Sequence, residues 1–273
     1  MGEIKSSHGP SLALGRKPLS PSIFPPMTTK IVGAGWVGTA VKSLFPNSII
    51  QTRDSKDLPI ADVAFVCVPT PLKDGKLDTS TVEKIVKEAK ESLIIIRSTV
   101  NPGTSDHLAK KYQKNIVFQP EFLGETPNHP LLDEKQIKFL ILGGSPNNRQ
   151  RAIGLYQQVY NANIKIRQVT NYEAEVIKLS ENRAIAFKVM QCQELYDVCE
   201  KAGTDYYTIR DAVYGDDPRF NLWWTFIYDG SRGFNSSKCL VKDVPAWCAW
   251  AESSGLDPEI TKLLVKKSNE YQT

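Results

Sequence analysis

Apolar residues follow different periodicities in the two halves of the chain. In the first half, short apolar runs alternate with segments of helical spacing, and the runs Val63–Val68 and Leu93–Ile96 are apolar throughout. Such runs are typical of strands buried on both faces of a sheet. Further strands are expected at Ile31–Val32, Ile49–Ile50, Ile116–Phe118, Phe139–Leu142 and Ile164–Val169. Helices are expected between them at Gly38–Phe45, Thr79–Lys90, Gly103–Tyr112 and Asn148–Val159. This alternation predicts an α/β fold with a doubly wound parallel sheet.

The second half is expected to be all-helical. Residues from Tyr172 to Ala202 contain neither Gly nor Pro and carry apolar residues at helical spacing. This pattern predicts one long helix that ends at Gly203. A short helix near Tyr206–Val213, a long loop at 215–238 and two helices at Asp243–Ser254 and Pro258–Tyr271 complete the prediction.

The chain is therefore expected to have three segments. Residues 1–26 are rich in Ser, Pro and Gly, which favours a disordered tail or a leader; an ordered arm packed on the body is the alternative. An α/β domain follows over residues 27–170, and a helical domain with the long helix covers residues 171–273.

Composition narrows the possible functions. Hydrophobic residues make up 41% of the chain and charged residues 23%, as in a globular protein with a core. No apolar run is long enough for a transmembrane helix. The net charge of +4 gives little support to nucleic-acid binding, which usually needs a concentrated basic face. The five cysteines lack the spacing of a zinc site, so we expect no metal. They also form no disulfide framework, so we expect free thiols in a reducing, cytoplasmic location.

A glycine-rich turn follows the first predicted strand. Gly33, Gly35 and Gly38 form a GxGxxG pattern between a strand and a helix, with Trp36 and Val37 inside it. In this context the pattern predicts dinucleotide binding: the glycines permit a tight turn, close approach of a pyrophosphate and helix packing.

The ribose-binding end of this dinucleotide site has two candidate residues, Asp54 and Arg53. Asp54 lies about twenty residues after Gly33, where an acidic residue binds the adenosine ribose. If the second strand ends at Gln51, however, Asp54 overshoots that position and is a solvated loop carboxylate. Arg53 would then be nearer and could accommodate the 2′-phosphate of NADP, so NAD is favoured only modestly.

Several polar residues are candidates for catalysis. Thr99, Glu121 and Glu125 follow predicted strands at the carboxyl edge of the sheet, where ligands bind in such folds. Lys178 and Asn182 are four residues apart and share one helix face, although Glu175 and Glu181 also suggest an ordinary surface ion pair.

Cys239, Lys242 and Asp243 form a further cluster. A helix start and a nearby lysine would both lower the pKa of the Cys239 thiol, and Lys238 could lower it further or fill the pocket. A buried, inert cysteine is the alternative.

Six motifs occurring in this order resemble the UDP-glucose/GDP-mannose dehydrogenase family. They are Gly33–Gly38, Val68–Pro71, Ser98–Ser105, Pro120–Glu125, Lys178 with Asn182, and Cys239–Asp243. The resemblance runs from Lys30 to about Trp247. It implies an NAD-binding Rossmann-like domain over residues 27–170 and a helical domain for dimerisation and substrate binding over residues 171–273.

The resemblance also implies a reaction: NAD-dependent oxidation of the C6 alcohol of a nucleotide sugar to a carboxylate. Cys239 matches the thiolate that carries the covalent intermediates, and Lys178 or a water held by Asp243 matches the base. Asn182 and Lys178 would stabilise oxyanions, Glu121 would activate water and Thr99 would orient it. Matched cofactor contacts are Val68, Pro69, Thr70, Thr99, Glu125 and Lys242. Matched substrate contacts are Glu121, Phe122, Leu123, Lys178, Asn182, Arg219 and Phe234.

The chain departs from the family in three ways. It is shorter by the domain that binds the nucleotide of the substrate. The linker from Gln51 to Asp62 leaves no room for a helix. Polar residues occupy the glycine-rich stretch before Cys239. Three functions therefore stay open: a compact nucleotide-sugar dehydrogenase, a β-hydroxyacid-type dehydrogenase that makes one oxidation, and a non-catalytic NAD-binding relic.

A homodimer is the expected assembly. The long helix is apolar on more than one face, which favours burial against a second chain. Trp223, Trp224, Phe226 and Tyr228 form an aromatic cluster in the long loop. They are expected to pack at the dimer interface; stacking on a base or sugar is the alternative.

Overall fold

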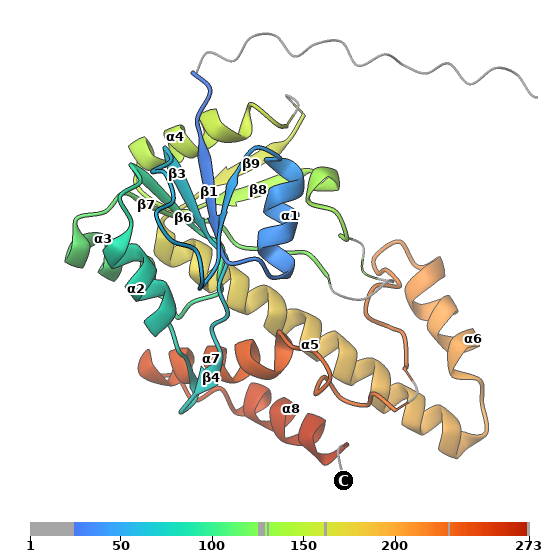
Figure 1. Ribbon diagram of the computed structural model, residues 1–273. Helices are drawn as coiled ribbons and strands as arrows, with labels where there is room; N and C mark the ends of the chain where they lie inside the picture. The colour runs from blue at the N-terminus through green and yellow to red at the C-terminus, as the bar shows by residue number, and fades with distance from the viewer. Residues whose placement is uncertain (1–24, 125–128, 130, 161–162, 229, 272–273) are drawn as a thin grey trace, which may run out of the picture.

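A parallel sheet and its helices form one end of the molecule, and the other end is mainly helical (Figure 1). The computed structural model describes residues 25–124, 129, 131–160, 163–228 and 230–271. The main sheet has the order β2-β1-β3-β6-β7 and every neighbouring pair is parallel. Its strands are β1 (Thr29–Val32), β2 (Ile49–Gln51), β3 (Val63–Val66), β6 (Leu93–Ile96) and β7 (Ile116–Phe118). A second parallel pair is formed by β8 (Phe139–Leu142) and β9 (Lys165–Gln168).

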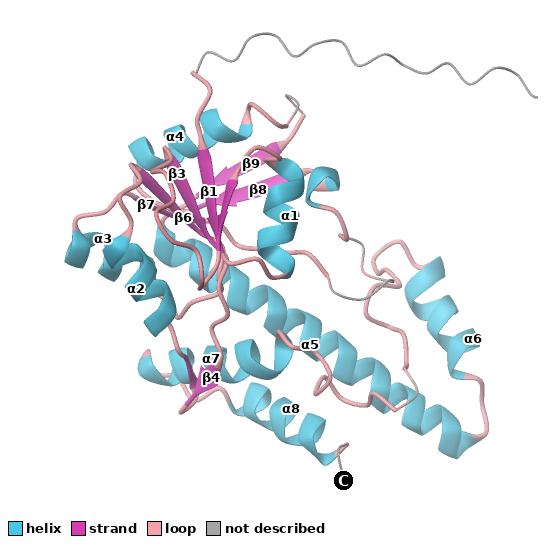
Figure 2. Ribbon diagram, viewed as in Figure 1, coloured by secondary structure: helices cyan, strands magenta, loops and turns pink. Residues whose placement is uncertain are grey.

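Helices cover both faces of the main sheet (Figure 2). Side chains of α1 (Trp36–Leu44) and α4 (Pro146–Tyr156) share one core with Ile31 and Phe65. Side chains of α2 (Ser80–Glu88) and α3 (Thr104–Tyr112) share another with Ile94 and Ile96. The predicted doubly wound α/β architecture is thus confirmed.

The connection from β2 to β3 contains no helix, as the short linker predicts. Residues 52–62 form turns and loop only, and β3 lies on the opposite side of β1 from β2. The carboxyl ends of β1, β3 and β6 therefore lie side by side, at the edge where the glycine turn and Thr99 emerge.

The structure also contains a small hairpin that the sequence pattern did not predict. Strands β4 (Leu72–Lys73) and β5 (Lys76–Leu77) are joined by Asp74 and Gly75, which both have positive φ. Asp-Gly at a two-residue turn is the available sequence signal. Leu77 is buried against Leu179 of the long helix and Ala246, so the hairpin connects the α/β part to the helical part.

The long helix is the backbone of the helical part. Helix α5 (Asn171–Ala202) begins with a capping box at Thr170 and Glu173, and Gly203 ends it with φ +69°. It is followed by α6 (Tyr206–Arg210), the π-helical turn η2 (Asp211–Asp216), α7 (Leu240–Ser253) and α8 (Glu259–Glu270); the short η1 (Glu134–Gln136) precedes β8. The division of the chain at residue 170 and the 1–26 tail stay predictions, and residues 1–24 lie outside the described residues.

Helices α7 and α8 pack against α5. Phe234, Leu240 and Val244 share a core with Ala186 and Met190 of α5. None of the helices within the described residues is both long and apolar enough to cross a membrane.

Candidate active site

The glycine turn has the shape that a bound dinucleotide requires. Gly33 has φ +105°, and a Cβ there would lie 2.3 Å from the carbonyl oxygen of Cys67. A Cβ at Gly38 would lie 2.0 Å from the carbonyl oxygen of Gly33. A Cβ at Gly35 would meet nothing within 4 Å, so this glycine leaves open space in front of the start of α1. Two glycines are needed for packing, and the third keeps the approach to the helix N-terminus clear.

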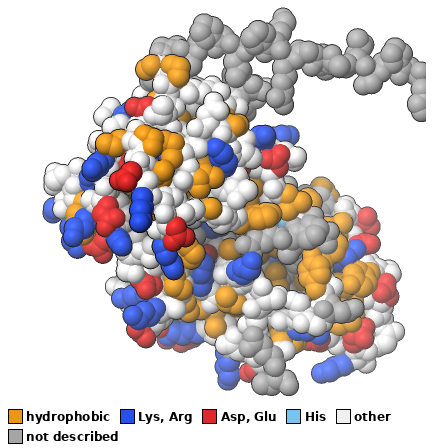
Figure 3. Space-filling view, in the orientation of Figure 1, with side chains coloured by type: hydrophobic (Ala, Val, Ile, Leu, Met, Phe, Trp, Pro, Cys, Tyr) orange, Lys and Arg blue, Asp and Glu red, His pale blue; other side chains and the backbone are white. Residues whose placement is uncertain are grey.

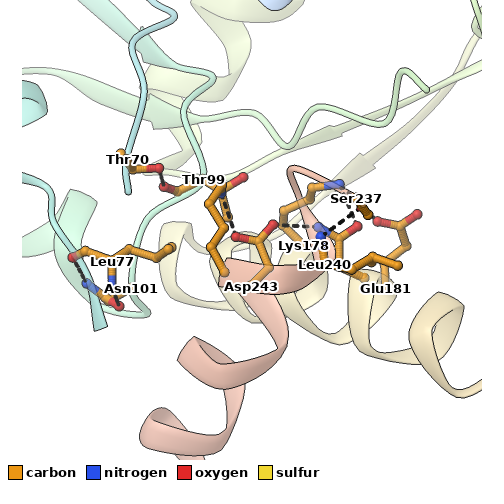
Figure 4. A network of polar contacts seen from close by, with 11 residues as sticks. Thr70, Leu77, Thr99, Asn101, Lys178, Glu181, Ser237, Leu240 and Asp243 are labelled. Atoms are coloured by element: carbon orange, nitrogen blue, oxygen red, sulfur yellow. Dashed lines mark hydrogen bonds and ion pairs between the residues drawn. The ribbon is translucent and has the colours of Figure 1, made fainter. Parts of the chain in front are cut away.

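Other predicted cofactor contacts lie at the same sheet edge. Val68, Pro69 and Thr70 follow β3, and the Thr70 hydroxyl donates to the carbonyl oxygen of Thr99, 2.7 Å away (Figure 4). The Val68 amide donates to the Ser98 hydroxyl at 2.8 Å. These bonds hold the loops after β3 and β6 together. Trp36 and Val37 open α1 directly after the glycine turn, and the Trp36 side chain is exposed.

A buried polar chain connects the long helix to α7. Lys178 Nζ donates to Asn182 Oδ1 at 3.1 Å, and Asn182 Nδ2 donates to Asp243 Oδ2 at 2.6 Å (Figure 4). Lys242 Nζ donates to the other carboxylate oxygen, Asp243 Oδ1, at 2.6 Å. Lys178, Asn182 and Asp243 are each less than 9% exposed. The alternative of an ordinary surface ion pair is therefore wrong for Lys178, although Glu181 does contact it at 3.0 Å.

Glu175, the other acidic neighbour of Lys178, has a different role. It is fully buried and accepts hydrogen bonds from the amides of Gly103 and Ser105, at 2.5 and 2.8 Å, at the start of α3.

The charges around Lys178 keep it cationic. Burial opposes a charged ammonium group, but Glu181, Glu121 and Asp243 outweigh it, so the pKa of Lys178 lies above its ordinary value. A lysine in this state serves to stabilise negative charge rather than to accept a proton.

Glu121 lies in the loop after β7 and is 8% exposed. Burial raises the pKa of Glu121, and the positive charges of Lys178 and Arg97 offset this only in part. Its carboxylate accepts a hydrogen bond from the Leu123 amide, while Lys178 Nζ lies 5.2 Å from the centre of the Phe122 ring. Glu121 and Phe122 thus interact with Lys178 from the loop after β7.

Cys239 occupies the N-cap position of α7 and is partly buried. Burial raises the pKa of the Cys239 thiol; Asp243 adds to the rise, and Lys178 and Lys242 oppose it. The expected lowering of this pKa is therefore wrong, because loss of hydration outweighs the two lysines.

One cavity of about 440 Å³ brings four of the six predicted catalytic residues together, whereas Thr99 and Asp243 are not among the residues that line it. Glu121, Lys178, Asn182 and Cys239 all line it. The predicted substrate residues Phe122, Leu123 and Phe234 line it as well. Lys238 also lies on its wall, so the polar stretch before Cys239 borders the space next to the thiol. Asp243 stands behind this wall and contacts the cavity residues through Asn182.

Aromatic side chains form the far wall of the cavity. Trp224, Phe226 and Tyr228 line it, and the His129 ring lies 5.8 Å from the Trp224 ring, edge to face. Hydrophobic side chains gather on the side of the helical part that carries α6 and this loop (Figure 3). Trp223 does not line the cavity and is 41% exposed.

Gln193 and His129 are among the cavity residues that the sequence analysis did not predict. Gln193 lies eleven residues after Asn182, close to three helical turns, and this spacing could have placed it on the same face of α5. His129 gave no signal in the sequence.

Arg219 and Asp54 lie apart from this cluster. Arg219 is exposed and pairs with Asp217 at 2.6 Å, and it is not among the residues that line the cavity. Asp54 is exposed in the turn that follows the end of β2 at Gln51, the geometry in which it overshoots the ribose site. Glu125 lies outside the described residues. Within the described ranges, no group of three or more His, Cys, Asp or Glu residues is arranged to hold a metal ion.

Comparison with known proteins matches both parts of the chain to domains of one family. Residues 47–162 match the NAD-binding domain of the UDP-glucose/GDP-mannose dehydrogenase family, and residues 172–271 match its central domain. The UDP-glucose 6-dehydrogenase of Rickettsia typhi is 29% identical over 227 residues, which are 78% of this chain and 50% of that protein. The chain thus spans about half the length of the curated relatives it matches.

Solved structures show the same fold. A UDP-glucose dehydrogenase from Pyrobaculum islandicum aligns with a TM-score of 0.77 at 22% identity, over 93% of this chain and 70% of that one. A 3-hydroxyisobutyrate dehydrogenase from Mycobacterium tuberculosis aligns with a TM-score of 0.67 at 14% identity, over 90% and 94% of the two chains.

Proposed function

Since the chain belongs to the UDP-glucose/GDP-mannose dehydrogenase family, we propose that it oxidises the C6 alcohol of a UDP-glucose-like nucleotide sugar to a carboxylate. The observation that carries this proposal is the convergence of Cys239, Lys178, Asn182 and Glu121 on one cavity. Each oxidation removes two electrons as a hydride from C6. The whole reaction converts one alcohol, two NAD⁺ and one water into a carboxylate, two NADH and three protons.

The cofactor site is assigned to the edge of the sheet at the glycine turn. NAD⁺, when bound, accepts the hydride from C6. Gly35 leaves space for its pyrophosphate at the start of α1, and the loop of Val68, Pro69 and Thr70 borders the same edge. NAD is the assigned cofactor because the matched family domain is described as NAD-binding.

In the first oxidation, the C6 hydroxyl loses its proton as the hydride leaves. Lys178 is cationic and so is poorly suited to take that proton. We assign the proton to a water held by Asp243, whose carboxylate is fixed by Asn182 and Lys242. Lys178 and Asn182 stabilise the negative charge that develops on the oxygen.

The second oxidation needs the thiol of Cys239. Its sulfur attacks the aldehyde carbon and forms a C–S bond, while the aldehyde oxygen takes up a proton to give a thiohemiacetal. The thiohemiacetal hydroxyl then loses its proton as the remaining C6 hydrogen leaves as a hydride, for which a second NAD⁺ would be the acceptor, and a thioester results. Water then adds to the thioester carbon, the C–S bond breaks, and the sulfur recovers a proton. Glu121, with its raised pKa, is suited to accept the proton of that water.

The reduced cysteines and the exposed helices support two further assignments. All five cysteines are free, which suits a reducing cytoplasm.

A groove between α5 and α8 exposes Ile260 and Leu263 beside Phe187 and Met190, and we assign it to a homodimer contact.

The stoichiometry of NADH tests the proposal. Purified protein is incubated with NAD and limiting UDP-glucose, UDP-N-acetyl sugars or GDP-mannose, and NADH is measured against the sugar consumed. Two NADH per sugar with one substrate are expected, and Cys239→Ser should stop turnover after the first oxidation. Cys248→Ser, at a buried cysteine outside the cavity, is the matched control. One NADH that is insensitive to Cys239→Ser would indicate a single oxidation, and NAD binding without turnover would indicate a non-catalytic protein.

A further inference from the structure

The loop that leads to Cys239 is anchored by one side chain of the long helix. Gln193 is 3% exposed, and its amide pairs with both backbone groups of Gly233. Gln193 Nε2 donates to the Gly233 carbonyl oxygen at 2.8 Å, and the Gly233 amide donates to Gln193 Oε1 at 2.6 Å. A single side chain thus makes the two bonds that a neighbouring strand would make, and it fixes both the position and the direction of the loop.

Helix α8 holds the next two residues of the same loop. Ser268 is fully buried; its hydroxyl accepts from the Phe234 amide at 2.9 Å, and its carbonyl oxygen accepts from Asn235 Nδ2 at 2.5 Å. Gly233 has φ +70°, and a Cβ there would lie 2.6 Å from the Ser268 hydroxyl oxygen. The fit of α8 against the loop therefore tolerates no side chain at residue 233.

Charged groups close this anchor from outside. Arg232 donates to Gln193 Oε1 at 3.0 Å and pairs with Asp197 at 2.5 Å. Tyr271 donates to the second oxygen of Asp197 at 2.6 Å, and its ring lies 4.5 Å from the Arg232 guanidinium. Helices α5 and α8 are thereby joined across the loop.

The anchored residues are connected to the thiol by a short, ordered path. Phe234 packs in the core with Leu240, the residue after Cys239. The Ser237 amide donates to the Phe234 carbonyl oxygen at 3.1 Å, and the Leu240 amide donates to the Ser237 hydroxyl at 3.1 Å. The loop therefore cannot shift at Gly233 without moving the start of α7, where Cys239 lies.

We propose that Gln193 and Ser268 are positioning residues for Cys239: they hold its loop so that the thiol meets the aldehyde formed beside Lys178 and Asn182. This inference rests on the proposed function. Gln193 and Asn182 lie on the same cavity-lining stripe of α5, so a single rigid helix sets the distance between the oxyanion-stabilising groups and the nucleophile. Ser268 acts from α8, none of whose residues lines the cavity.

Two measurements on Gln193→Ala test this role. The first is alkylation of Cys239 by iodoacetamide at pH 7.5, followed by mass spectrometry; the other four cysteines are buried. A loosened loop exposes the thiol, so Cys239 should react about tenfold faster than in the parent protein. The second is the product ratio: NADH per sugar should fall from two toward one, with the escaping aldehyde trapped by hydroxylamine.

Gln191→Ala is the matched control, because Gln191 is an exposed glutamine of the same helix. Ser268→Ala removes a single hydrogen bond; it should speed alkylation of Cys239 about threefold and lower the NADH per sugar below two, which keeps the test decisive if Gln193→Ala does not fold. Alkylation rates and NADH ratios equal to those of Gln191→Ala would overturn the proposal. If the parent protein makes no NADH while alkylation still accelerates, the positioning role stands and the proposed function fails.

Discussion

Glu175 provides a direct test of how the long helix is joined to the α/β part. Its carboxylate is buried at the start of α3, where it accepts hydrogen bonds from the amides of Gly103 and Ser105. Burial raises the pKa of Glu175 to about 7, because the loss of hydration outweighs these bonds. An ordinary glutamate has a pKa of 4.5, so the folded protein holds this proton more tightly than the unfolded chain.

The sign and size of the effect follow from this difference. A raised carboxyl pKa makes the folded state less stable as the pH rises, and the loss develops between pH 4.5 and about pH 7. The shift corresponds to about 3 kcal/mol at about 1.4 kcal/mol per pKa unit. Glu175→Gln resembles the protonated form and has no such dependence. The free energy of unfolding of this variant, relative to that of the parent protein, should therefore rise by about 3 kcal/mol between low pH and pH 8.

Urea unfolding, monitored by circular dichroism at half-unit intervals from pH 4.5 to pH 8.5, measures this difference. Glu173→Gln is the control, since Glu173 lies two residues earlier in α5 and hydrogen bonds to Thr170 lower its pKa. Its stability difference from the parent should change with pH in the opposite direction. The reasoning fails if the stability of Glu175→Gln relative to the parent protein does not rise between pH 4.5 and pH 8, which would mean that the helix start favours the charged carboxylate.

Four further predictions concern the packing of the glycine turn, the cofactor, the substrate and the assembly. Gly38→Ala should destabilise the protein by about 3 kcal/mol in thermal or urea unfolding, because its Cβ meets the Gly33 carbonyl oxygen. Gly35→Ala should leave stability within about 1 kcal/mol but weaken NAD binding more than tenfold in calorimetry; equal NAD affinity would place the cofactor elsewhere. Trp224→Ala should raise the KM for the sugar about tenfold with little change in kcat, and an unchanged KM would remove the aromatic wall from the substrate site. Gel filtration should give twice the monomer mass, and Ile260→Glu with Leu263→Glu should halve it; a parent monomer would refute the dimer.

The strands of the main sheet could be predicted because their apolar sequences indicate that they are buried. Leu93–Ile96 was placed without error, since four consecutive apolar residues next to helical segments suit a strand covered on both faces. The β4–β5 hairpin was missed because each of its strands has two residues, too few for a period to appear. Its only signal is the Asp74-Gly75 turn.

The sequence predicted several of the residues that line the cavity, but not their electrostatics. Sequence spacing placed Lys178 and Asn182 on one helix face, yet it could not tell whether that face met solvent or protein. Burial of this face depends on α7, whose Asp243 lies 61 residues after Asn182 in the chain. The same limit explains Cys239: the helix start and the lysines are visible in the sequence, whereas the desolvation that raises its pKa comes from segments far apart in the chain.

Two raised pKa values in the cavity suggest how, under the proposed function, the site avoids reacting before an aldehyde is present. The pKa of Cys239 is raised, so its thiol keeps its proton, and the pKa of Lys178 is raised, so its ammonium keeps its charge. In this state the cavity holds the Lys178 ammonium group, which can stabilise an oxyanion, beside an unreactive thiol. An aldehyde polarised by Lys178 and Asn182 would change the balance, because its oxygen can take up the proton that the sulfur gives up as the C–S bond forms. The thiol would then need no separate base, and the geometry set by α5 would decide which carbonyl it attacks.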